Sequence, residues 1–473
     1  MKKYDTFLSG YFKPILFGYK HVFFLFLLIP LTTFSQLQDN HGSLRNKTWS
    51  FVGNAGFSMG TANFIDLAVD PSGMPWVVFV NETGNMYVKK YEGGQWLMTG
   101  SSFSYSSIFP ALAFGPSETP YVAYQDGEYD GNATVRKFNG TAWLPVGQPG
   151  FSQGNVIFPS LAFSPAGEPF VAFSDDTKSG KATVMKYNGV TWNNVGNAGF
   201  SAGEAEYLSL AFGPGGEPWL AFKDYGHTGK LSVMKFDGTT WLYAGQPGLS
   251  AGIADNVSLA FGPSDAPYVA FCDGDLGYKA RVVRFNGTTW NDVGTPGFSA
   301  GAAEYTELVF TQSGEPHVGF RDFAHQRKAT VMKFNGASWI TLGNEGFSPD
   351  TTDYNALAID PDDRLYAAFQ DYGNDHKISV MKYDSLFSGI SDVAQCKFSI
   401  YPNPAKATVT LDFQNRRENI ENIEVTGIRG SPICSFRPSG SRIIIDVVDY
   451  PAGVYVVKIR VGESIVRGKF CKE

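Results

Sequence analysis

Short segments with alternating apolar and polar positions recur along most of the chain. One representative unit has four such segments, at residues 208–212, 219–224, 230–236 and 240–244. An alternation with a period of two predicts β-strands, and the Gly-, Pro- and Asn-rich stretches between the segments predict turns. We name the four strands of a unit A, B, C and D in chain order. The pattern therefore predicts an all-β fold built from four-stranded units.

Tryptophan marks the period of the repeat, once in each strand D. The residues are Trp49, Trp96, Trp143, Trp192, Trp241, Trp290 and Trp339, at spacings of 47 or 49 residues. A period of this length is typical of β-propeller blades, because one four-stranded sheet cannot bury both faces unless similar sheets stack on either side. Asn-Gly or Asp-Gly between strands C and D supplies the positive φ angles of a two-residue hairpin turn.

The two ends of the repeat complement each other. The last unit has strands A, B and C at residues 356–359, 366–371 and 378–383, but it lacks the tryptophan-bearing strand D. Residues 48–52 form such a strand with nothing before it. Joining the two would close the ring and remove its open sheet edges. We therefore predict a seven-bladed propeller over residues 43–388, with the N-terminal strand completing blade 7.

The period ends at residue 388, and residues 396–473 have a different pattern. About seven short alternating strands in this tail predict a small immunoglobulin-like β-sandwich. The tail also contains Tyr401-Pro-Asn-Pro404, Gly427-x-x-Gly430, Gly453-x-Tyr455 and a basic C-terminal end. These motifs resemble the type A sorting domain of the bacterial type IX secretion system, the Por secretion tail. The resemblance implies that this secretion machinery is a partner, and that the protein is secreted from or attached to the outer surface of a Gram-negative bacterium.

The N-terminus has the features of an export signal. Four lysines precede an apolar run at residues 22–31, namely Lys2, Lys3, Lys13 and Lys20. Small residues precede Gln36. This pattern predicts a signal peptide at residues 1–35, cleaved after Ser35, so the mature protein would have no transmembrane span. An uncleaved membrane anchor is the alternative.

Composition excludes some functions and leaves others open. The net charge of −7 lacks the basic surplus that phosphate binding requires, which argues against a nucleic-acid partner. The four cysteines have no Cys-x-x-Cys spacing, so they indicate neither a zinc site nor a disulfide scaffold. Two pairing states of Cys434 and Cys471 stay open, a disulfide formed on export and free thiols.

The repeat resembles kelch-type propellers in unit length and in an aromatic residue before the tryptophan, as in Tyr187 with Trp192 and Phe236 with Trp241. It lacks the kelch double glycine after strand B. The Trp-Asp pair of WD40 repeats and the Asp box of sialidases are also absent from the sequence, so the resemblance concerns architecture alone.

Strand B ends with a carboxylate in six units. These residues are Asp126, Asp175, Asp224, Asp273, Asp322 and Asp371, with Asn81 at the same place in the first unit. A ring of carboxylates could bind calcium or a sugar. Strand C, however, begins with a lysine six residues later in most units, so a cross-strand ion pair or a turn cap explains the aspartates equally simply. We favour this structural role.

A second acidic set precedes strand A, where the long loops should lie near the central channel. Its members are Glu206, Asp255, Glu304 and Asp353, whereas other units have Asn63 and Ile157. Because the set occupies only part of the ring, it is our candidate for ligand binding. Close carboxylates would repel one another unless a calcium ion or the strand-C lysines compensate for them. The sequence does not identify a metal, and calcium is the one cofactor that the set suggests.

Aromatic residues begin strand B in most units, and sugar stacking or packing between blades would explain them. His227, His325 and His376 lie in different units, too far apart to share a metal. No His-Glu-x-x-His motif occurs in the sequence.

We interpret the protein as a binding protein for extracellular glycan or protein, which uses its long-loop face. The alternative is a polysaccharide hydrolase or lyase with carboxylates at the channel mouth, and a structural adhesive is a third interpretation. The near-identity of the blades argues against an enzyme, because catalysis needs differently tuned groups.

Overall fold

The computed structural model describes residues 47–262, 265–385, 398–413, 420–427, 432–437, 442–461 and 464–473. The predicted signal peptide at residues 1–35 and Cys396 lie outside these ranges, as do the outermost residues of the predicted propeller. Regular structure in the described ranges consists of β-strands and of short 3-10 turns. No helix among these residues has the length and apolarity to span a bilayer.

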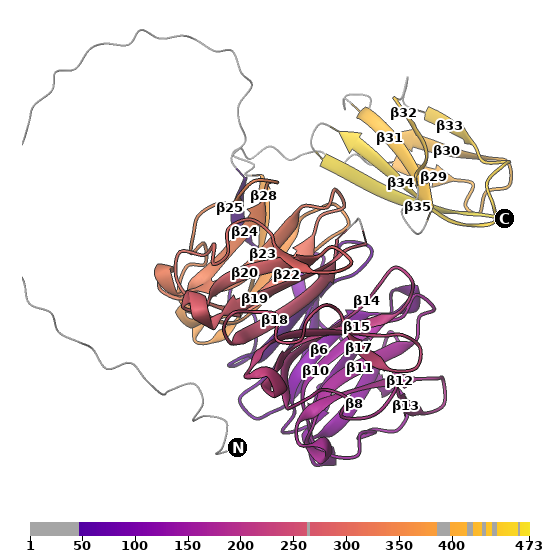
Figure 1. Ribbon diagram of the computed structural model, residues 1–473. Coiled ribbons are helices and arrows are strands. Elements are labelled where there is room, and N and C mark those ends of the chain that lie inside the picture. The colour runs from indigo at the N-terminus through magenta and orange to yellow at the C-terminus, as the bar shows by residue number, and fades with distance from the viewer. Residues whose placement is uncertain are drawn as a thin grey trace, which may run out of the picture. The chain divides into compact units, whose positions relative to one another are not determined.

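Seven four-stranded antiparallel sheets follow one another over residues 47–385. We number them as blades 1 to 7 (Figure 1). Blade 1 contains β2 (Asn63–Val69), β3 (Pro75–Val80), β4 (Met86–Glu92) and β5 (Gln95–Met98), and blade 2 contains β6 (Ile108–Phe114), β7 (Pro120–Asp126), β8 (Asn132–Phe138) and β9 (Trp143–Pro145). Blade 3 contains β10 (Val156–Phe163), β11 (Pro169–Asp175), β12 (Lys181–Tyr187) and β13 (Trp192–Asn194). Blade 4 contains β14 (Ala205–Phe212), β15 (Pro218–Asp224), β16 (Lys230–Phe236) and β17 (Trp241–Tyr243).

The remaining blades repeat this order. Blade 5 contains β18 (Ala254–Phe261), β19 (Pro267–Asp273), β20 (Lys279–Phe285) and β21 (Trp290–Asp292), and blade 6 contains β22 (Ala303–Phe310), β23 (Pro316–Asp322), β24 (Lys328–Phe334) and β25 (Trp339–Thr341). Blade 7 contains β26 (Thr352–Ile359), β27 (Leu365–Asp371), β28 (Lys377–Ser385) and, from the N-terminal end, β1 (Lys47–Phe51).

The short 3-10 turns lie in the loops. They are η1 (Pro116–Glu118), η2 (Gly127–Tyr129), η3 (Asp176–Lys178), η4 (Tyr225–His227), η5 (Gly274–Leu276), η6 (Phe323–His325) and η7 (Tyr372–Asn374). Apart from η1, each follows the aspartate that ends a strand B.

The N-terminal strand β1 is the outer strand of blade 7. It pairs antiparallel with β28, with Trp49 opposite Tyr383. The strands A of successive blades contact each other, and β2 of blade 1 contacts β26 of blade 7. The ring is therefore closed, with the strands A innermost. The predicted all-β, seven-bladed propeller is confirmed.

The repeated tryptophans join neighbouring blades. Each indole Nε1 donates a hydrogen bond to a main-chain carbonyl of the preceding blade at 2.6 to 2.8 Å, as Trp49 does to Leu342. Gly343, with φ of +75°, follows that carbonyl, and a Cβ there would lie 3.1 Å from Cδ1 of Trp49. A side chain would therefore be strained by the backbone and crowded by the ring. This explains why a glycine accompanies the tryptophan in every unit.

Residues 398–473 form a separate β domain of two sheets. The first has the order β29 (Phe398–Tyr401), β30 (Thr408–Phe413), β33 (Arg442–Asp446), and the second has β32 (Pro432–Phe436), β31 (Ile420–Gly427), β34 (Gly453–Val461), β35 (Ser464–Lys472). Alternate residues of both sheets, such as Leu411 and Val457, are buried in one core. The predicted sandwich is therefore present. Cys434 and Cys471 are free thiols, and Cys434 Sγ lies 3.3 Å from the hydroxyl of Tyr450.

Candidate functional site

The strand-B aspartates act as turn caps. In blade 4, Asp224 is fully buried, and its Oδ1 accepts a hydrogen bond from Gly226 N–H at 2.9 Å. Its Oδ2 accepts from Ser232 Oγ at 2.8 Å. Lys230 stands opposite Asp224 in the strand register, as expected. Both oxygens of the carboxylate thus accept hydrogen bonds from groups of the same blade, which agrees with the structural interpretation of this set.

The first half of the second acidic set is held by Lys223 of β15. Lys223 Nζ lies 3.1 Å from Glu206 of its own blade and 2.8 Å from Asp255 of blade 5. Burial lowers the pKa of Lys223, but the hydrogen bond and charge of Asp255 outweigh burial and raise it above its usual value. Lys223 therefore stays charged and links two blades.

Arg321 of β23 holds the second half in the same way. Its Nη1 lies 3.0 Å from Glu304 and 2.9 Å from Asp353 of blade 7. Burial raises the pKa of Glu304, whereas the charge of Arg321 opposes this and that of Asp353 adds to it. Both compensating cations lie on strand B, one residue before its terminal aspartate, and are not the strand-C lysines that the sequence suggested as one of two alternatives.

The gap between blades 5 and 6 is different. Its strand-B residue is Cys272, whose buried thiol donates to the carbonyl of Ala303 at 3.0 Å. Asp255 and Glu304 flank this gap from the two blades, and each meets its cation on the far side. The four predicted residues thus lie in adjacent blades at the channel mouth, with their charge partly compensated.

Exposed aromatic residues lie beside these ion pairs, and the sequence analysis missed them. Tyr225, Phe323 and Tyr372 are 43%, 37% and 38% exposed. The Tyr225 hydroxyl donates to Glu206 at 3.1 Å, and the Tyr372 hydroxyl donates to Asp353 at 3.4 Å. Arg321 lies 5.6 Å from the ring centre of Phe323. Each ring is the first residue after the strand-B aspartate, a position that could have been found by aligning the repeats.

Below the mouth, a β-bulge in strand A places one side chain per blade around the centre. In blade 4 the register shifts between Glu206 and Ser209, and Tyr207 has φ of +52°. The equivalent residues are Phe64, Phe109, Phe158, Tyr207, Asn256, Tyr305 and Tyr354, with φ between 48° and 53°. Neighbouring rings contact each other at centroid distances of 5.0 to 5.8 Å, from Tyr305 round to Tyr207. Asn256 interrupts this aromatic ring in blade 5.

A second ring of side chains follows the bulge, and it contains two carboxyl groups. Ser160, Ser209 and Ser258 each accept a hydrogen bond from a strand-A N–H of the next blade. Asp66 and Glu307 do the same for Leu112 and Leu357 at 2.7 and 2.6 Å. The Glu307 carboxyl therefore lies between blades 6 and 7, and the Asp66 carboxyl lies between blades 1 and 2.

These two carboxyl groups have perturbed pKa values. Burial raises the pKa of Asp66 from 3.8 to about 6. Burial and then the charge of Asp66 raise the pKa of Glu307 from 4.5 to about 8. Both side chains keep some accessible surface. At neutral pH this pair therefore carries less negative charge than two ordinary carboxylates.

The aromatics that begin strand B pack between blades, which was one of the two explanations that the sequence left open. Trp76, Phe170 and Trp219 are buried. Each makes an edge-to-face contact with a strand-A phenylalanine of the next blade, at 4.9 to 5.8 Å between ring centres. Tyr268 makes the same contact with Phe310 but stays partly exposed.

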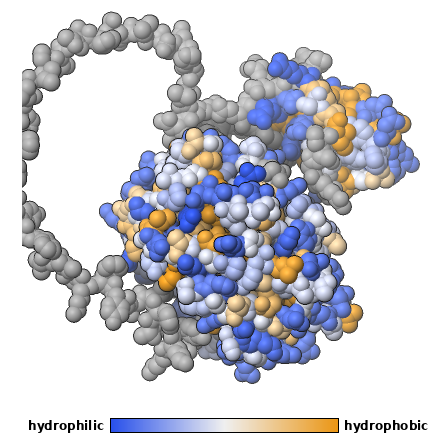
Figure 2. All heavy atoms as spheres, viewed as in Figure 1, coloured by the Kyte–Doolittle hydropathy of each residue, from blue (hydrophilic) through white to orange (hydrophobic). Residues whose placement is uncertain are grey.

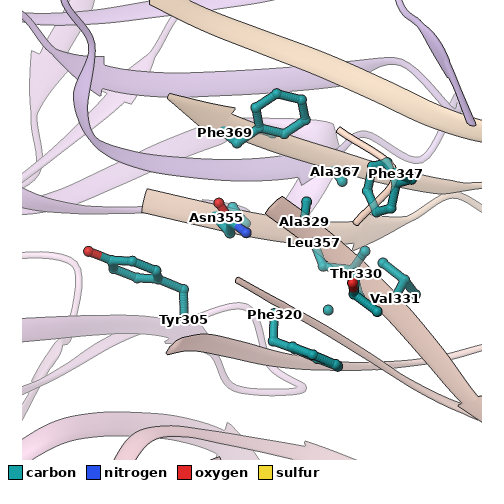
Figure 3. A pocket seen from close by; sticks show the side chains of 13 residues that line it. Tyr305, Phe320, Ala329, Thr330, Val331, Phe347, Asn355, Leu357, Ala367 and Phe369 are labelled. Atoms are coloured by element: carbon teal, nitrogen blue, oxygen red, sulfur yellow. The ribbon is translucent and has the colours of Figure 1, made fainter. Parts of the chain in front are cut away.

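A cavity between blades 6 and 7 is too small for a ligand. Its volume of about 10 Å³ leaves room for about one water molecule. Figure 3 shows the amide of Asn355 among side chains such as Leu357 and Phe369. The amide nitrogen and oxygen are both buried, and neither has a hydrogen-bond partner among the residues that the structure describes.

Neither a metal centre among the described residues nor a large apolar patch on the face in view is evident. Within the described ranges, no group of three or more His, Cys, Asp and Glu side chains is arranged to hold a metal ion. Hydrophobic residues lie in small groups among hydrophilic ones on the face in view (Figure 2).

The C-terminal domain can now be assigned from its two-sheet fold and its sequence. Residues 399–473 match the family of secretion system C-terminal sorting domains. This confirms the predicted resemblance. A sorting domain of this kind indicates that the type IX secretion machinery exports the protein to the cell surface or outside the cell. The resemblance of the repeat to kelch-type propellers stays a prediction.

Solved structures show a likeness to the propeller fold. The BP39L lectin from Burkholderia pseudomallei has a TM-score of 0.50 at 16% identity, over 71% of this chain and 99% of the lectin. A PL25 ulvan lyase bound to -[GlcA(1-4)Rha3S]- has a TM-score of 0.47 at 11% identity, over 70% and 94%. A protein of unknown function from Dyadobacter fermentans DSM 18053 has a TM-score of 0.43 at 14% identity, over 72% and 98%. No curated protein matches this sequence. At these identities the likeness concerns the fold alone.

Proposed function

We propose that the protein is a secreted or surface-attached binding protein whose propeller recognises an extracellular glycan on the loop face of blades 4 to 7. The observation that carries the proposal is the combination of an exposed ring with a charged pair in three of these blades, such as Tyr225 beside Glu206 and Lys223. A sugar ring presents an apolar face that packs on an aromatic ring and hydroxyl groups that bond to carboxylates and cations.

The charge balance favours a polyhydroxy ligand over calcium. Lys223 and Arg321 already occupy the inner sides of the four carboxylates. A calcium ion needs six to eight oxygen ligands, and it would have to displace these cations. A hydroxyl group could instead bond to Asp255 and Glu304 at the gap between blades 5 and 6, where the strand-B residue is Cys272.

The rings provide a cleaner test than the carboxylates. Replacing Glu206, Asp255, Glu304 and Asp353 by amides would leave Lys223 and Arg321 buried without partners, so the variant would also lose stability. Three single variants remove only a partly exposed ring and leave both cations with their partners. They are Tyr225→Ala, Phe323→Ala and Tyr372→Ala. Tyr129→Ala is the matched control, because Tyr129 is 39% exposed in the equivalent turn of blade 2.

The experiment is an array of extracellular bacterial, algal and plant polysaccharides, probed with the chain from residue 36 onward. We expect wild type and Tyr129→Ala to bind the same glycan, and each of the three other variants to bind it about 5- to 30-fold more weakly, which corresponds to about 1 to 2 kcal/mol per aromatic contact. Equal binding by all variants would refute the loop-face site. Absence of binding by wild type would refute the proposal that the ligand is a glycan.

A polysaccharide hydrolase or lyase is the second candidate. The observation that favours it is the raised pKa of Glu304 beside Asp353 at the channel mouth, because a general acid must hold its proton near the working pH. Glycan binding with release of reducing ends, and loss of that release in Glu304→Gln, would favour the enzyme. Binding without product release favours the binding protein.

A further inference from the structure

An open groove lies between blades 5 and 6, on the side of the propeller that carries the tight turns. Its volume is about 550 Å³, within the range of about 300 to 1,000 Å³ that is usual for small-molecule sites. The C–D turns at Asn286 and Asn335 and the A–B turn at residues 313–316 form its rim. The loop-face residues proposed above lie at the other end of the blades, since they precede strand A or follow strand B.

The groove combines apolar rings with polar groups from two blades. Tyr268 and Phe334 line it together with Arg284, Glu315 and Asp292. Tyr268 is partly exposed, whereas Phe170 and Trp219 at the same position of blades 3 and 4 are buried. The Arg284 guanidinium lies 5.5 Å from the ring centre of Tyr268. A ring, a guanidinium and carboxylates thus line one open space.

The residues of blade 5 differ from those of blades 3 and 6 at the positions of a charged pair. In blades 3 and 6, the lysine near the end of strand C pairs with a glutamate of its own A–B turn, at 3.4 Å for Lys186 with Glu168 and 3.1 Å for Lys333 with Glu315. In blade 5 the equivalent residues are Arg284 and Ala266. The guanidinium of blade 5 and the carboxylate of blade 6 therefore line the same groove from opposite sides.

We propose that this groove is a second carbohydrate site, which binds one neutral sugar residue. Tyr268 provides an apolar surface for a pyranose ring, and Glu315, Asp292 and Arg284 provide acceptors and donors for its hydroxyl groups. Both carboxylates are already paired with a cation, Asp292 with Arg281 at 2.6 Å and Glu315 with Lys333 at 3.1 Å. Their charges are therefore balanced, and their remaining oxygen lone pairs can accept from the hydroxyl groups of a neutral sugar. With a site on each face, one molecule can bind two glycan chains and hold them together with increased avidity.

An extended peptide is the other occupant to consider. Strand β21 is the outer strand of blade 5 and lines the groove, so a peptide could add to its edge. However, β21 has only three residues, which allows few main-chain hydrogen bonds. The edge therefore favours a ligand that is bound by side chains.

The test uses methyl glycosides of neutral hexoses and deoxyhexoses as probes, with saturation-transfer NMR on the chain from residue 36 onward. Arg284→Met and Glu315→Gln are the groove variants. Lys186→Met and Glu168→Gln are matched controls at the same positions of blade 3. Tyr372→Ala reports on the loop face separately, so failure of this proposal can be told from failure of the proposed function.

We expect at least one glycoside to bind wild type and both blade-3 controls, and a loss confined to Tyr372→Ala would report on the loop-face site alone. The two groove variants should bind that glycoside about tenfold more weakly, as expected for the loss of one charged hydrogen bond. Absence of binding to wild type across the panel would overturn the proposal. Equal binding by the groove variants, equal loss in the blade-3 controls, or competition by an extended peptide in place of sugars would also overturn it.

Discussion

Glu307→Gln should make the propeller more stable at neutral and alkaline pH. Glu307 accepts a hydrogen bond from Leu357 N–H at 2.6 Å. Glutamine keeps an oxygen acceptor of the same size for this N–H group but cannot ionise. The variant therefore removes the titration of Glu307 while it keeps the link between blades 6 and 7.

The size of the effect follows from the pKa of Glu307, which burial raises from 4.5 to about 8. Because the folded value is above the unfolded value, the folded state binds this proton more tightly. Its stabilising contribution is complete below about pH 4.5 and is lost as the pH rises through about 8. By pH 8 the loss is about 4 kcal/mol, from about 1.4 kcal/mol for each pKa unit.

The assay is denaturant unfolding of wild type and variant at several pH values between about 5 and 8, followed by the fluorescence of the blade tryptophans. The two proteins should differ little at the acidic end, and the variant should be more stable by a few kcal/mol at the alkaline end. Asp66, whose pKa is raised to about 6, faces Glu307 and titrates in the same window in both proteins.

Ser258→Ala is the control, because Ser258 Oγ accepts the equivalent hydrogen bond, from Leu308 N–H at 3.0 Å, and does not titrate in this window. Its effect on unfolding should be the same at every pH. A difference between wild type and Glu307→Gln that stays constant with pH would refute the reasoning, and so would a variant that becomes less stable as pH rises.

Four further outcomes are expected. Deleting residues 47–51 should lower the stability of the propeller by about 3 to 5 kcal/mol in denaturant unfolding, because blade 7 loses buried Trp49 and its outer strand; an unchanged midpoint would contradict the closure. Asn355→Leu should raise the midpoint, since an unpartnered buried amide costs about 1 to 3 kcal/mol, and a lower midpoint would show that the amide is satisfied. Arg321→Met should destabilise the protein by about 3 to 5 kcal/mol, because Glu304 and Asp353 lose their shared cation; a neutral effect in the same assay would contradict the clamp. Removing residues 399–473 should leave the protein inside the cell envelope, and its normal appearance in the medium on immunoblots would argue against export through the sorting domain.

The architecture was predictable because its causes are local and repeated. Each blade carries the same tryptophan and the same strand alternation, and blades 2 to 6 share the Asn-Gly or Asp-Gly hairpin turn, so repeated copies of one signal support each other. The sorting domain was predictable for a different reason, since several of its motifs occur in order within one short segment. The position of each acidic residue before strand A was also predictable, because it follows from the period.

The partners of these residues were less predictable, because side-chain reach decides them. Lys223 and Arg321 come directly before Asp224 and Asp322, the aspartates that cap the turns. Alternation along strand B indicates only that each cation lies on the opposite face from the aspartate beside it. Whether each reaches one carboxylate or two depends on the distance between blades, which no repeat pattern records. The strand-C lysines, which the sequence suggested as one of two alternatives, begin a strand that lies farther from the centre.

The bulge in strand A explains why the carboxyl groups of Asp66 and Glu307 were missed. A strand without a bulge would place residues two and four apart on one face, and this rule separates Glu304 from Glu307. The extra residue at Tyr305 shifts the register, so Glu304 and Glu307 lie opposite Arg321 and Gly319, which are two residues apart, and the two glutamates therefore share one face of the sheet. A bulky residue with positive φ gives no sign of itself in a hydrophobicity pattern. Aligned repeats would still have revealed the anomaly, because Asp66 and Glu307 stand in a column that is otherwise Ser or Ala. Two acids in a column of small residues are a departure from the repeat, and such departures, unlike the repeat itself, are where this propeller can differ in function from one blade to the next.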